Sequence, residues 1–177
     1  MENPVVQRIV EACTGARVAT LRFNFRGVGA STGSHDAGRA EQHDLAAALD
    51  HLAGLLGPAA IAAAGYSFGA MVTAAVAARR AALRGVALIA PPLARARIPW
   101  EGLAALPALL LVVGDHDDYC PPEAVAAITA ALPDADVRVI PGADHFFAGA
   151  LEPLGDAVGA WAHALGAGNT LGGRRSG

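Results

Sequence analysis

The chain of 177 residues contains no lysine, and only 16% of its residues are charged, giving a net charge of −3. Its basic residues are arginines scattered along the sequence. The nearest approach to a cluster, Arg79, Arg80 and Arg84, has the spacing of the solvated end of a helix. A nucleic-acid-binding domain usually shows a strongly basic stripe or patch. We therefore expect no nucleic acid among its partners.

Cysteines and long apolar runs are also scarce. The two cysteines, Cys13 and Cys120, lie far apart among apolar neighbours, which favours small buried residues over a disulfide and fits a reducing cytoplasm. The amino-terminal residues have no basic leader followed by an apolar core, so no signal peptide is predicted. The longest apolar runs, 52–64 and 102–113, are interrupted by proline and too short to cross a bilayer. A soluble, cytoplasmic protein without membrane association is predicted.

Apolar residues, by contrast, make up 54% of the chain, enough for one large core, and we expect a single domain over 1–166 with a disordered tail over 167–177. Asn3 is the expected cap of the first helix, Pro4 its first residue and Gly15 its end. Strands are expected at 18–25, 59–66, 85–90, 108–114 and 136–140, and the later helices at 40–56, 68–82, 121–132 and 150–165.

This alternation of helix and strand predicts the α/β class, with a mostly parallel sheet flanked by helices. The strands at 59–66 and 85–90 are apolar on both faces, as strands buried beneath helices on both sides tend to be. The irregular connection 91–107 is the one place for a cap over the sheet, and its shortness predicts a minimal cap. The sequence leaves the oligomeric state open, with a homo-oligomer as one alternative.

Polar side chains follow three of the expected strands. Ser67 follows the strand 59–66; Asp115, Asp117 and Asp118 follow 108–114; Asp144 and His145 follow 136–140. In a parallel sheet, ligands and catalytic groups gather beyond the carboxyl ends of the strands. The order serine, aspartate, histidine along the chain is the order of a hydrolase with a nucleophile elbow.

The stretch Gly-Tyr-Ser-Phe-Gly at 65–69 has the form of that elbow, Gly-x-Ser-x-Gly. A strand that turns directly into a helix leaves its serine in a strained conformation, where bulky residues two places away would collide; Gly65 and Gly69 are expected to remove the collision. His145 is expected to take the serine proton while an aspartate holds the imidazole. The N–H of Phe68 is expected to be one donor to the oxyanion.

Three longer motifs extend the pattern: FNFRGVGASTG at 23–33, GYSFGA at 65–70 and GADHFF at 142–147. With these motifs the chain resembles α/β-hydrolases, and among them small bacterial hydrolases near the dienelactone-hydrolase branch. The resemblance runs from about Asn3 to Trp161 and implies an α/β-hydrolase fold. It implies Ser67 as nucleophile, His145 as base and, through the family pattern G-x-x-D, Asp117 as the acid, with Asp115 as the second choice.

The resemblance also implies that the domain is shortened at its amino-terminal side. Relatives begin earlier, with further strands and a loop that supplies the second oxyanion donor. One of those strands would lie between the segments 18–25 and 59–66. A misassigned start or a truncated chain, direct pairing of the two flanking strands, or a strand from another chain would each account for the difference.

Other interpretations of single residues are weaker. The glycine-rich loop at 26–39 lacks the G-x-G-x-x-G spacing of a dinucleotide site, and it is expected to form a tight turn with Arg26. His43 and His51 would point in different directions on a helix, and His116 belongs to the turn that carries the acid, so no metal is predicted. Tyr66, Trp100 and Phe146 could line the substrate site, although at least one of the aromatic residues Trp100, Phe146 and Phe147 should serve the core.

The sequence therefore predicts a serine hydrolase that cleaves short-chain carboxylic esters through an acyl-enzyme, without a cofactor. A serine in place of the cysteine used by the branch's namesake favours simple ester hydrolysis over dienelactone opening. Two alternatives stay open: a catalytically weak remnant of the fold that binds a ligand or partner, and an amidase or peptidase-like hydrolase with the same triad.

Overall fold

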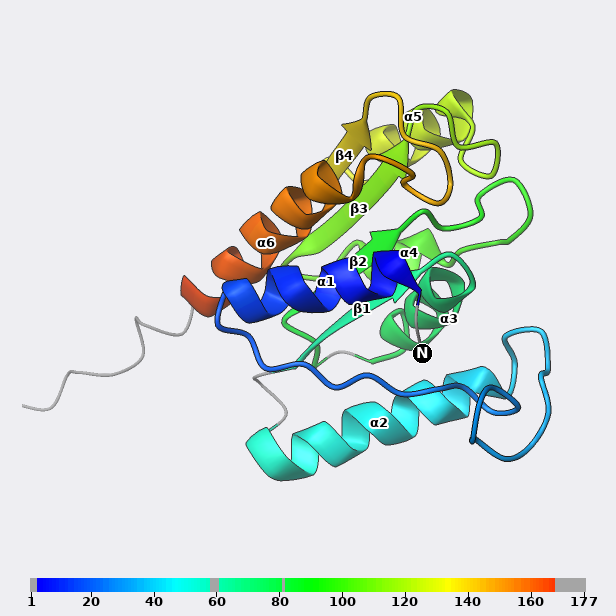
Figure 1. Ribbon diagram of the computed structural model, residues 1–177, viewed down its shortest axis with the longest axis vertical. Coiled ribbons are helices and arrows are strands. Elements are labelled where there is room, and N and C mark those ends of the chain that lie inside the picture. Colours follow the sequence, from blue (N-terminus) through cyan, green and yellow to red (C-terminus); the bar gives the residue numbers. More distant parts are fainter. Residues whose placement is uncertain (1–2, 58–60, 81, 168–177) are drawn as a thin grey trace, which may run out of the picture.

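The computed structural model describes residues 3–57, 61–80 and 82–167 (Figure 1). Four parallel strands form the sheet of the described residues, in the order β1 (Ala62–Tyr66), β2 (Gly85–Ile89), β3 (Leu109–Gly114) and β4 (Asp136–Ile140). Their register places Tyr66 opposite Ile89, Ile89 opposite Val112, and Gly114 opposite Ile140. All four carboxyl ends therefore meet at one edge of the sheet.

Helices cover both faces of this sheet (Figure 1). One face carries α1 (Pro4–Gly15) and α6 (Leu151–Ala167), which pack against each other. The other carries α3 (Phe68–Ala77), with α2 (Glu41–Leu56) packed on it, together with the short α4 (Trp100–Leu103) and α5 (Pro122–Ala131). The expected α/β class with a parallel sheet between helices is confirmed, and α4, with 4 residues, is the only helix of the connection between β2 and β3.

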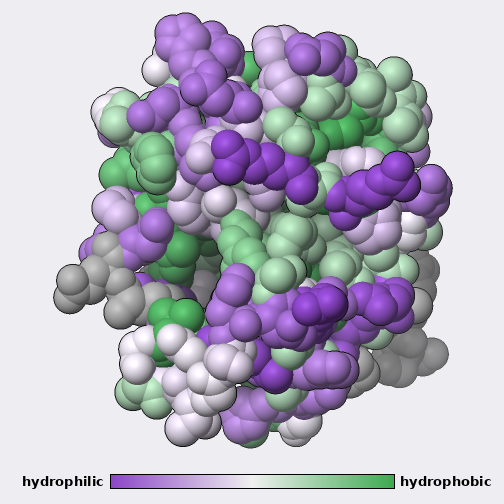
Figure 2. Space-filling model, turned by 90° about the vertical axis from the view of Figure 1, so that its right-hand side faces the viewer, coloured by the Kyte–Doolittle hydropathy of each residue, from purple (hydrophilic) through white to green (hydrophobic). Residues whose placement is uncertain are grey.

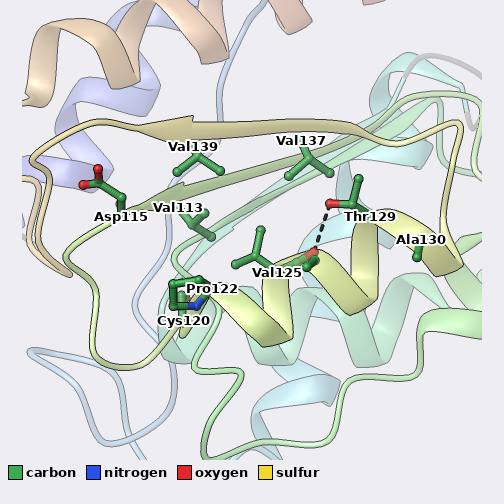
Figure 3. A pocket seen from close by; sticks show the side chains of 11 residues that line it. Val113, Asp115, Cys120, Pro122, Val125, Thr129, Ala130, Val137 and Val139 are labelled. Carbon is green, nitrogen blue, oxygen red and sulfur yellow. Dashed lines mark hydrogen bonds between the residues drawn. The ribbon is translucent and has the colours of Figure 1, made fainter.

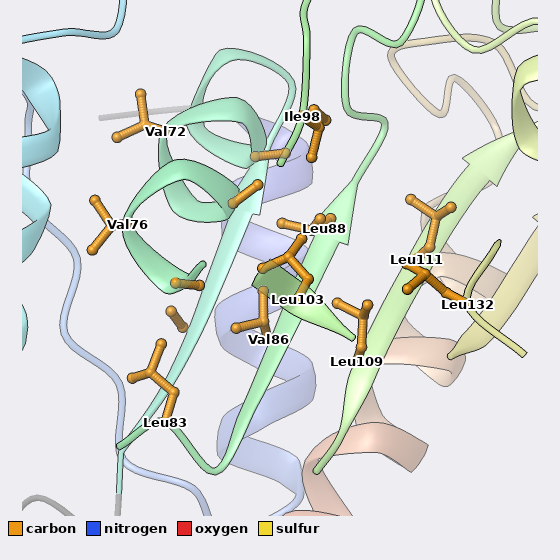
Figure 4. Close-up of a cluster of buried hydrophobic side chains, with 14 of the residues drawn as sticks. Val72, Val76, Leu83, Val86, Leu88, Ile98, Leu103, Leu109, Leu111 and Leu132 are labelled. Carbon is orange, nitrogen blue, oxygen red and sulfur yellow. The ribbon is translucent and has the colours of Figure 1, made fainter. Parts of the chain in front are cut away.

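Each face has its own apolar core, and the alternating side chains of the central strands divide between the two. Val86, Leu88 and Leu111 belong to the core on the α3 side of the sheet (Figure 4), whereas Ala87, Ile89 and Leu110 belong to the core beneath α1 and α6. All residues of β2 and β3 are buried. The uninterrupted apolar runs that predicted these strands thus reflect burial on both faces.

Local signals set several boundaries as expected. The Asn3 carboxamide accepts hydrogen bonds from the N–H groups of Val5 (3.0 Å) and Val6 (3.2 Å), and Pro4 opens α1. Both cysteines are free and buried, as expected. Helix α3 ends earlier than expected, because the N–H groups of Arg79 and Arg80 bond three residues back and form turns.

The expectation of a strand at 18–25 is wrong, and so is the direct pairing of that segment with the strand that precedes Ser67. Residues 18–25 make no ladder, and β1 is the outer strand of the sheet, with Ala64 exposed. Phe23 and Phe25 instead pack on the α3 face of the core. The pattern of this segment is that of a strand, but a strand forms only beside a neighbour with free backbone groups in register.

The expected tail falls almost wholly outside the described residues. Of the expected strand 59–66, only the part from residue 61 onward is described. No helix within the described ranges combines the length and apolar character that crossing a membrane requires.

Candidate active site

Ser67 occupies the sharp turn between β1 and α3. Its backbone has φ 50° and ψ −117°, a combination that is strained for any residue with a side chain. The Ser67 N–H donates to the carbonyl of Ile89 on β2 at 2.9 Å, which extends the strand pairing to the turn itself. The strand, the turn and the helix therefore fix the serine at the carboxyl edge of the sheet.

The two glycines beside this turn differ in what they contribute. A Cβ on Gly65 would overlap with the carbonyl oxygen of Gly69 and the hydroxyl of Thr73, so the helix can approach the strand only because Gly65 has no side chain. A Cβ on Gly69 would meet no atom within 4 Å. The expected collision at Gly69 is therefore absent, and the steric requirement lies with Gly65 alone.

Three polar side chains from three strand ends form a chain of hydrogen bonds. The Ser67 hydroxyl oxygen lies 2.8 Å from Nε2 of His145, and Nδ1 of His145 lies 2.9 Å and 3.1 Å from the two carboxylate oxygens of Asp117. A carboxylate only accepts, so the proton of the neutral imidazole resides on Nδ1 and Nε2 is free to accept from Ser67. His145 and Asp117 are 8% and 3% exposed, which shields the pair from water.

Asp117, rather than Asp115, is the aspartate that contacts His145. The N–H of Tyr119 donates to the Asp117 carboxylate at 2.8 Å, which orients it toward the imidazole. Asp115 is exposed and accepts instead from the N–H of Gly142 at 2.6 Å. Its position is structural, because it ties the loop after β3 to the loop after β4.

Those two loops are joined closely where they pass each other. The N–H of His116 donates to the carbonyl of Ala143 at 3.0 Å, and a Cβ on Gly114 would overlap with the same carbonyl. Asp144 shapes the histidine turn by accepting from the N–H groups of Phe146 and Ala148, both at 3.0 Å. These contacts hold the turn that carries His145 against the loop that carries Asp117.

Aromatic rings surround the imidazole. The rings of Tyr66, Tyr119 and Phe146 lie 5.6, 4.5 and 5.5 Å from that of His145, centroid to centroid. Phe146 is 66% exposed, whereas Phe147 is fully buried in the core beneath α6. Trp100 is partly buried against the α3-face core, and no contact described for it reaches the three hydrogen-bonded residues.

The loop from residue 26 to residue 40 borders α3 and is anchored by two acids. Arg26 binds Asp44 through its guanidinium (2.6 Å) and its backbone N–H (3.0 Å), and Gly27, with φ 71°, closes the expected tight turn by donating to the carbonyl of Thr32. That arginine holds the pKa of Asp44 below its usual value.

Glu41 is the second anchor, and no pattern in the sequence indicates this role. Its side chain is fully buried and accepts from the N–H groups of Asp36 (2.8 Å) and Gly38 (2.9 Å), with Nδ1 of His35 at 2.9 Å. Burial alone would raise the pKa of Glu41, but the backbone donors and His35 lower it overall. A glutamate at the start of a helix ordinarily suggests a solvated residue near the positive end of the dipole.

An apolar groove of about 640 Å³ lies elsewhere, between α5 and the strands β3 and β4 (Figure 3). Val125 and Thr129 of α5 face Val137 and Val139 of β4 across it, and the Thr129 hydroxyl is already bonded to the carbonyl of Val125. None of Ser67, Asp117 and His145 lines the groove.

Figure 2 shows the side of the molecule toward which the strands end, where hydrophilic residues surround a paler, more apolar area. Among the described residues, no three His, Cys, Asp or Glu side chains are grouped so that they could hold a metal ion. Ser67, His145 and Asp117 bring a hydroxyl, an imidazole and a carboxylate together at this rim.

Comparison with known proteins identifies the same fold. The model of the alpha/beta hydrolase fold family matches residues 4–108. A protein of unknown function from Agrobacterium tumefaciens, described as a candidate alpha/beta hydrolase, is 32% identical with a TM-score of 0.82, over 93% of this chain and 78% of that one. An alpha-beta serine hydrolase homologue from Coxiella burnetii is 35% identical with a TM-score of 0.77, over 90% and 76% of the two chains.

A third solved structure, from Xanthomonas campestris, is described as an alpha/beta serine hydrolase without a lid. It is 30% identical with a TM-score of 0.80, over 93% of this chain and 74% of that one. The matched region thus contains the strand order, the elbow and the short connection after β2. This chain belongs to the alpha/beta-hydrolase family and is a homologue of the serine hydrolases of that fold.

Proposed function

We propose that this protein is a serine hydrolase that cleaves carboxylic esters of short acyl groups through an acyl-enzyme intermediate. The observation that carries the proposal is the continuous set of hydrogen bonds from Ser67 through His145 to Asp117. In this arrangement a hydroxyl that is a weak nucleophile alone is activated by an adjacent base, which is oriented in turn by a third group.

In the first half of the reaction, the Ser67 oxygen attacks the ester carbonyl carbon while its proton passes to Nε2 of His145. The imidazolium that forms is stabilised by Asp117, which keeps its own negative charge. The tetrahedral intermediate then collapses, and the alcohol leaves with the proton from Nε2. In the second half, water repeats the attack on the acyl-Ser67 ester with His145 again as base, and the acid is released.

The developing oxyanion needs hydrogen-bond donors. Phe68 is the first residue of α3, and an N–H in the first turn of a helix has no partner within that helix. The Phe68 N–H is accordingly available to the oxyanion, with the positive end of the helix dipole behind it. Losing one donor of an oxyanion hole costs about 10²–10³ in rate, so a site resting on this N–H alone would still be active.

Two features favour small substrates. The connection between β2 and β3 contains only the 4-residue α4, too little to form a large cover, and the similar Xanthomonas campestris protein is described as lacking a lid. Phe146, largely exposed beside the His145 ring, offers an apolar contact for a short acyl or alcohol group. The residues described at this rim offer no apolar tunnel or cover that would enclose a long lipid chain.

The test uses p-nitrophenyl acetate and a fluorophosphonate probe on the native protein and on Ser67→Ala, with the exposed Ser34→Ala as the matched control. We expect the native protein and Ser34→Ala to hydrolyse the ester and to be labelled, and Ser67→Ala to do neither. Equal hydrolysis by the native protein and Ser67→Ala would refute the proposal. A matched acetyl ester and acetanilide decide between esterase and amidase, and we expect much faster cleavage of the ester.

A further inference from the structure

Tyr66 lies between Gly65 and the serine, at the last position of β1, where the sequence suggested a substrate-lining side chain. Its hydroxyl instead donates to the main-chain carbonyl of His145 at 3.1 Å, across 79 positions of sequence. The residue that adjoins the nucleophile in the chain is therefore bonded directly to the backbone of the histidine.

The ring of Tyr66 contributes to the same contact. It lies 5.6 Å from the imidazole at an interplanar angle of 34°, while the ring of Tyr119 lies 4.5 Å away at 45°. Tyr119 is held in its own place by the guanidinium of Arg95, 4.6 Å from its centroid. The imidazole thus lies beside both tyrosine rings, while its two nitrogens are bonded to Ser67 and Asp117.

The distance between the imidazole and Ser67 also depends on where the turn that carries His145 is held, because the side-chain hydrogen bonds do not fix the main chain. Asp115 and Asp144 fix that turn from the side of β3 and from within. The Tyr66 hydroxyl fixes it from the side of β1, which is the strand that delivers the serine. Because the nucleophile and the base must stay within hydrogen-bond reach, this connection acts on the distance that matters for proton transfer.

We propose that Tyr66 is a positioning residue, whose hydroxyl holds the main chain of His145 at the distance from Ser67 that proton transfer requires. The inference rests on the proposed function and deepens it by assigning to the elbow tyrosine a role other than contact with substrate. Burial, together with the charges of Asp117 and Asp144, raises the pKa of Tyr66 to about 12. The phenol therefore stays protonated, and able to donate, at neutral pH.

The test compares the native protein with Tyr66→Phe, which keeps the ring and removes the hydroxyl. Thr129→Val, which removes a hydrogen-bonding hydroxyl in the groove beside α5, is the control. With p-nitrophenyl acetate we expect kcat of Tyr66→Phe to fall roughly three- to tenfold, the effect of one hydrogen bond, with KM changed less than twofold. Thr129→Val should match the native protein in both constants.

A second readout needs no substrate. The Nδ1 proton of His145, bonded to Asp117, should give a resolved downfield NMR signal in the native protein and a signal broadened by exchange with water in Tyr66→Phe. Tyr66→Leu, which also removes the ring, should broaden it further, while unfolding curves monitor whether each variant remains folded.

A kcat of Tyr66→Phe within twofold of native, or a rise of KM alone, would overturn the inference, since the second result would mark Tyr66 as a substrate contact. If the native protein neither hydrolyses esters nor reacts with the fluorophosphonate, the proposed function fails instead. The NMR comparison then still decides the role of Tyr66, and an unchanged signal in Tyr66→Phe would count against it.

Discussion

The hydroxyl oxygen of Ser67 and Nε2 of His145 lie 2.8 Å apart, although 78 positions of sequence separate the two residues. The distance is set by the sheet, because the serine follows β1, an outer strand, and the histidine follows β4, the other outer strand. The turn after β4 therefore comes back across the ends of β3 and β2 to meet the serine at the end of β1. Changes that alter either loop should therefore affect activity before they affect the fold.

Asp117→Asn should lower kcat by about 10³–10⁴, because an amide can present its N–H₂ group to Nδ1 and favour the wrong tautomer of His145. Asp115→Asn, the matched change two residues away, keeps an oxygen for the N–H of Gly142 and should lose less than tenfold. Steady-state hydrolysis of p-nitrophenyl acetate measures both. A larger loss in Asp115→Asn than in Asp117→Asn would reverse the assignment of the acid.

Gly65→Ala should destabilise the protein by about 1–3 kcal/mol or prevent folding, since the added methyl group overlaps with Gly69 and Thr73. Gly69→Ala should cost little, or stabilise slightly, because it adds a methyl group in open space within a helix. Urea unfolding midpoints of the two variants measure the contrast. Equal destabilisation by both would show that the elbow tolerates neither side chain for a reason other than overlap.

Glu41→Gln should lower the midpoint of thermal unfolding by several degrees at pH 7, because the buried carboxylate accepts two backbone N–H groups. The folded-state pKa of Glu41 lies below its ordinary value of 4.5. Its contribution is therefore complete above that value and is lost as the pH falls through the folded pKa. The difference between native and Glu41→Gln should shrink in acid.

The exposed Glu101→Gln serves as control for that change and should leave the unfolding midpoint as it is. Thermal unfolding followed by circular dichroism at pH 7 and at pH 3.5 checks both variants. A difference between native and Glu41→Gln that grows in acid would contradict the sign of the pKa shift.

The thiols of Cys13 and Cys120 should react very slowly with Ellman's reagent at pH 8 in the native protein. Both are free and buried, and burial raises the pKa of each thiol, with the charge of Asp117 helping to bring that of Cys120 to about 12. The thiolate is the reactive form of cysteine, and the raised pKa of each thiol leaves little thiolate at pH 8. In guanidinium chloride both thiols should titrate at once. Rapid reaction in native buffer would show that one of the sites opens.

Much of this architecture could be read from the sequence, where the deciding signals are local. Asn3 caps α1 by accepting from N–H groups two and three residues further on, and Pro4 is the first residue of that helix. The uninterrupted apolar runs of β2 and β3 indicate directly that these strands are buried. The segment 18–25 alternates polar residues (Thr20, Arg22, Asn24) with apolar ones as a half-buried strand does, yet it forms no strand. A strand depends on a neighbour supplied by another part of the chain, and periodicity carries no information about that neighbour.

The candidate site shows the same division. The serine and the histidine stand out because a motif surrounds each, whereas the choice of Asp117 over Asp115 came from a family pattern and not from periodicity. Glu41 and the bond between Tyr66 and His145 depend on loops meeting in three dimensions. No sequence pattern indicates that the side chain of Tyr66 reaches the main chain of His145, 79 positions later.

The backbone of Ser67 has a further consequence for how this protein could change under selection. With φ 50° and ψ −117° the residue has a backbone conformation that glycine adopts without strain and that is strained for the other amino acids. Ser67→Gly should consequently raise the unfolding midpoint while abolishing hydrolysis, which calorimetry and an activity assay on one sample would reveal. Laboratory selection for thermal stability alone would therefore favour inactive variants with glycine at position 67, so each round must also select for activity.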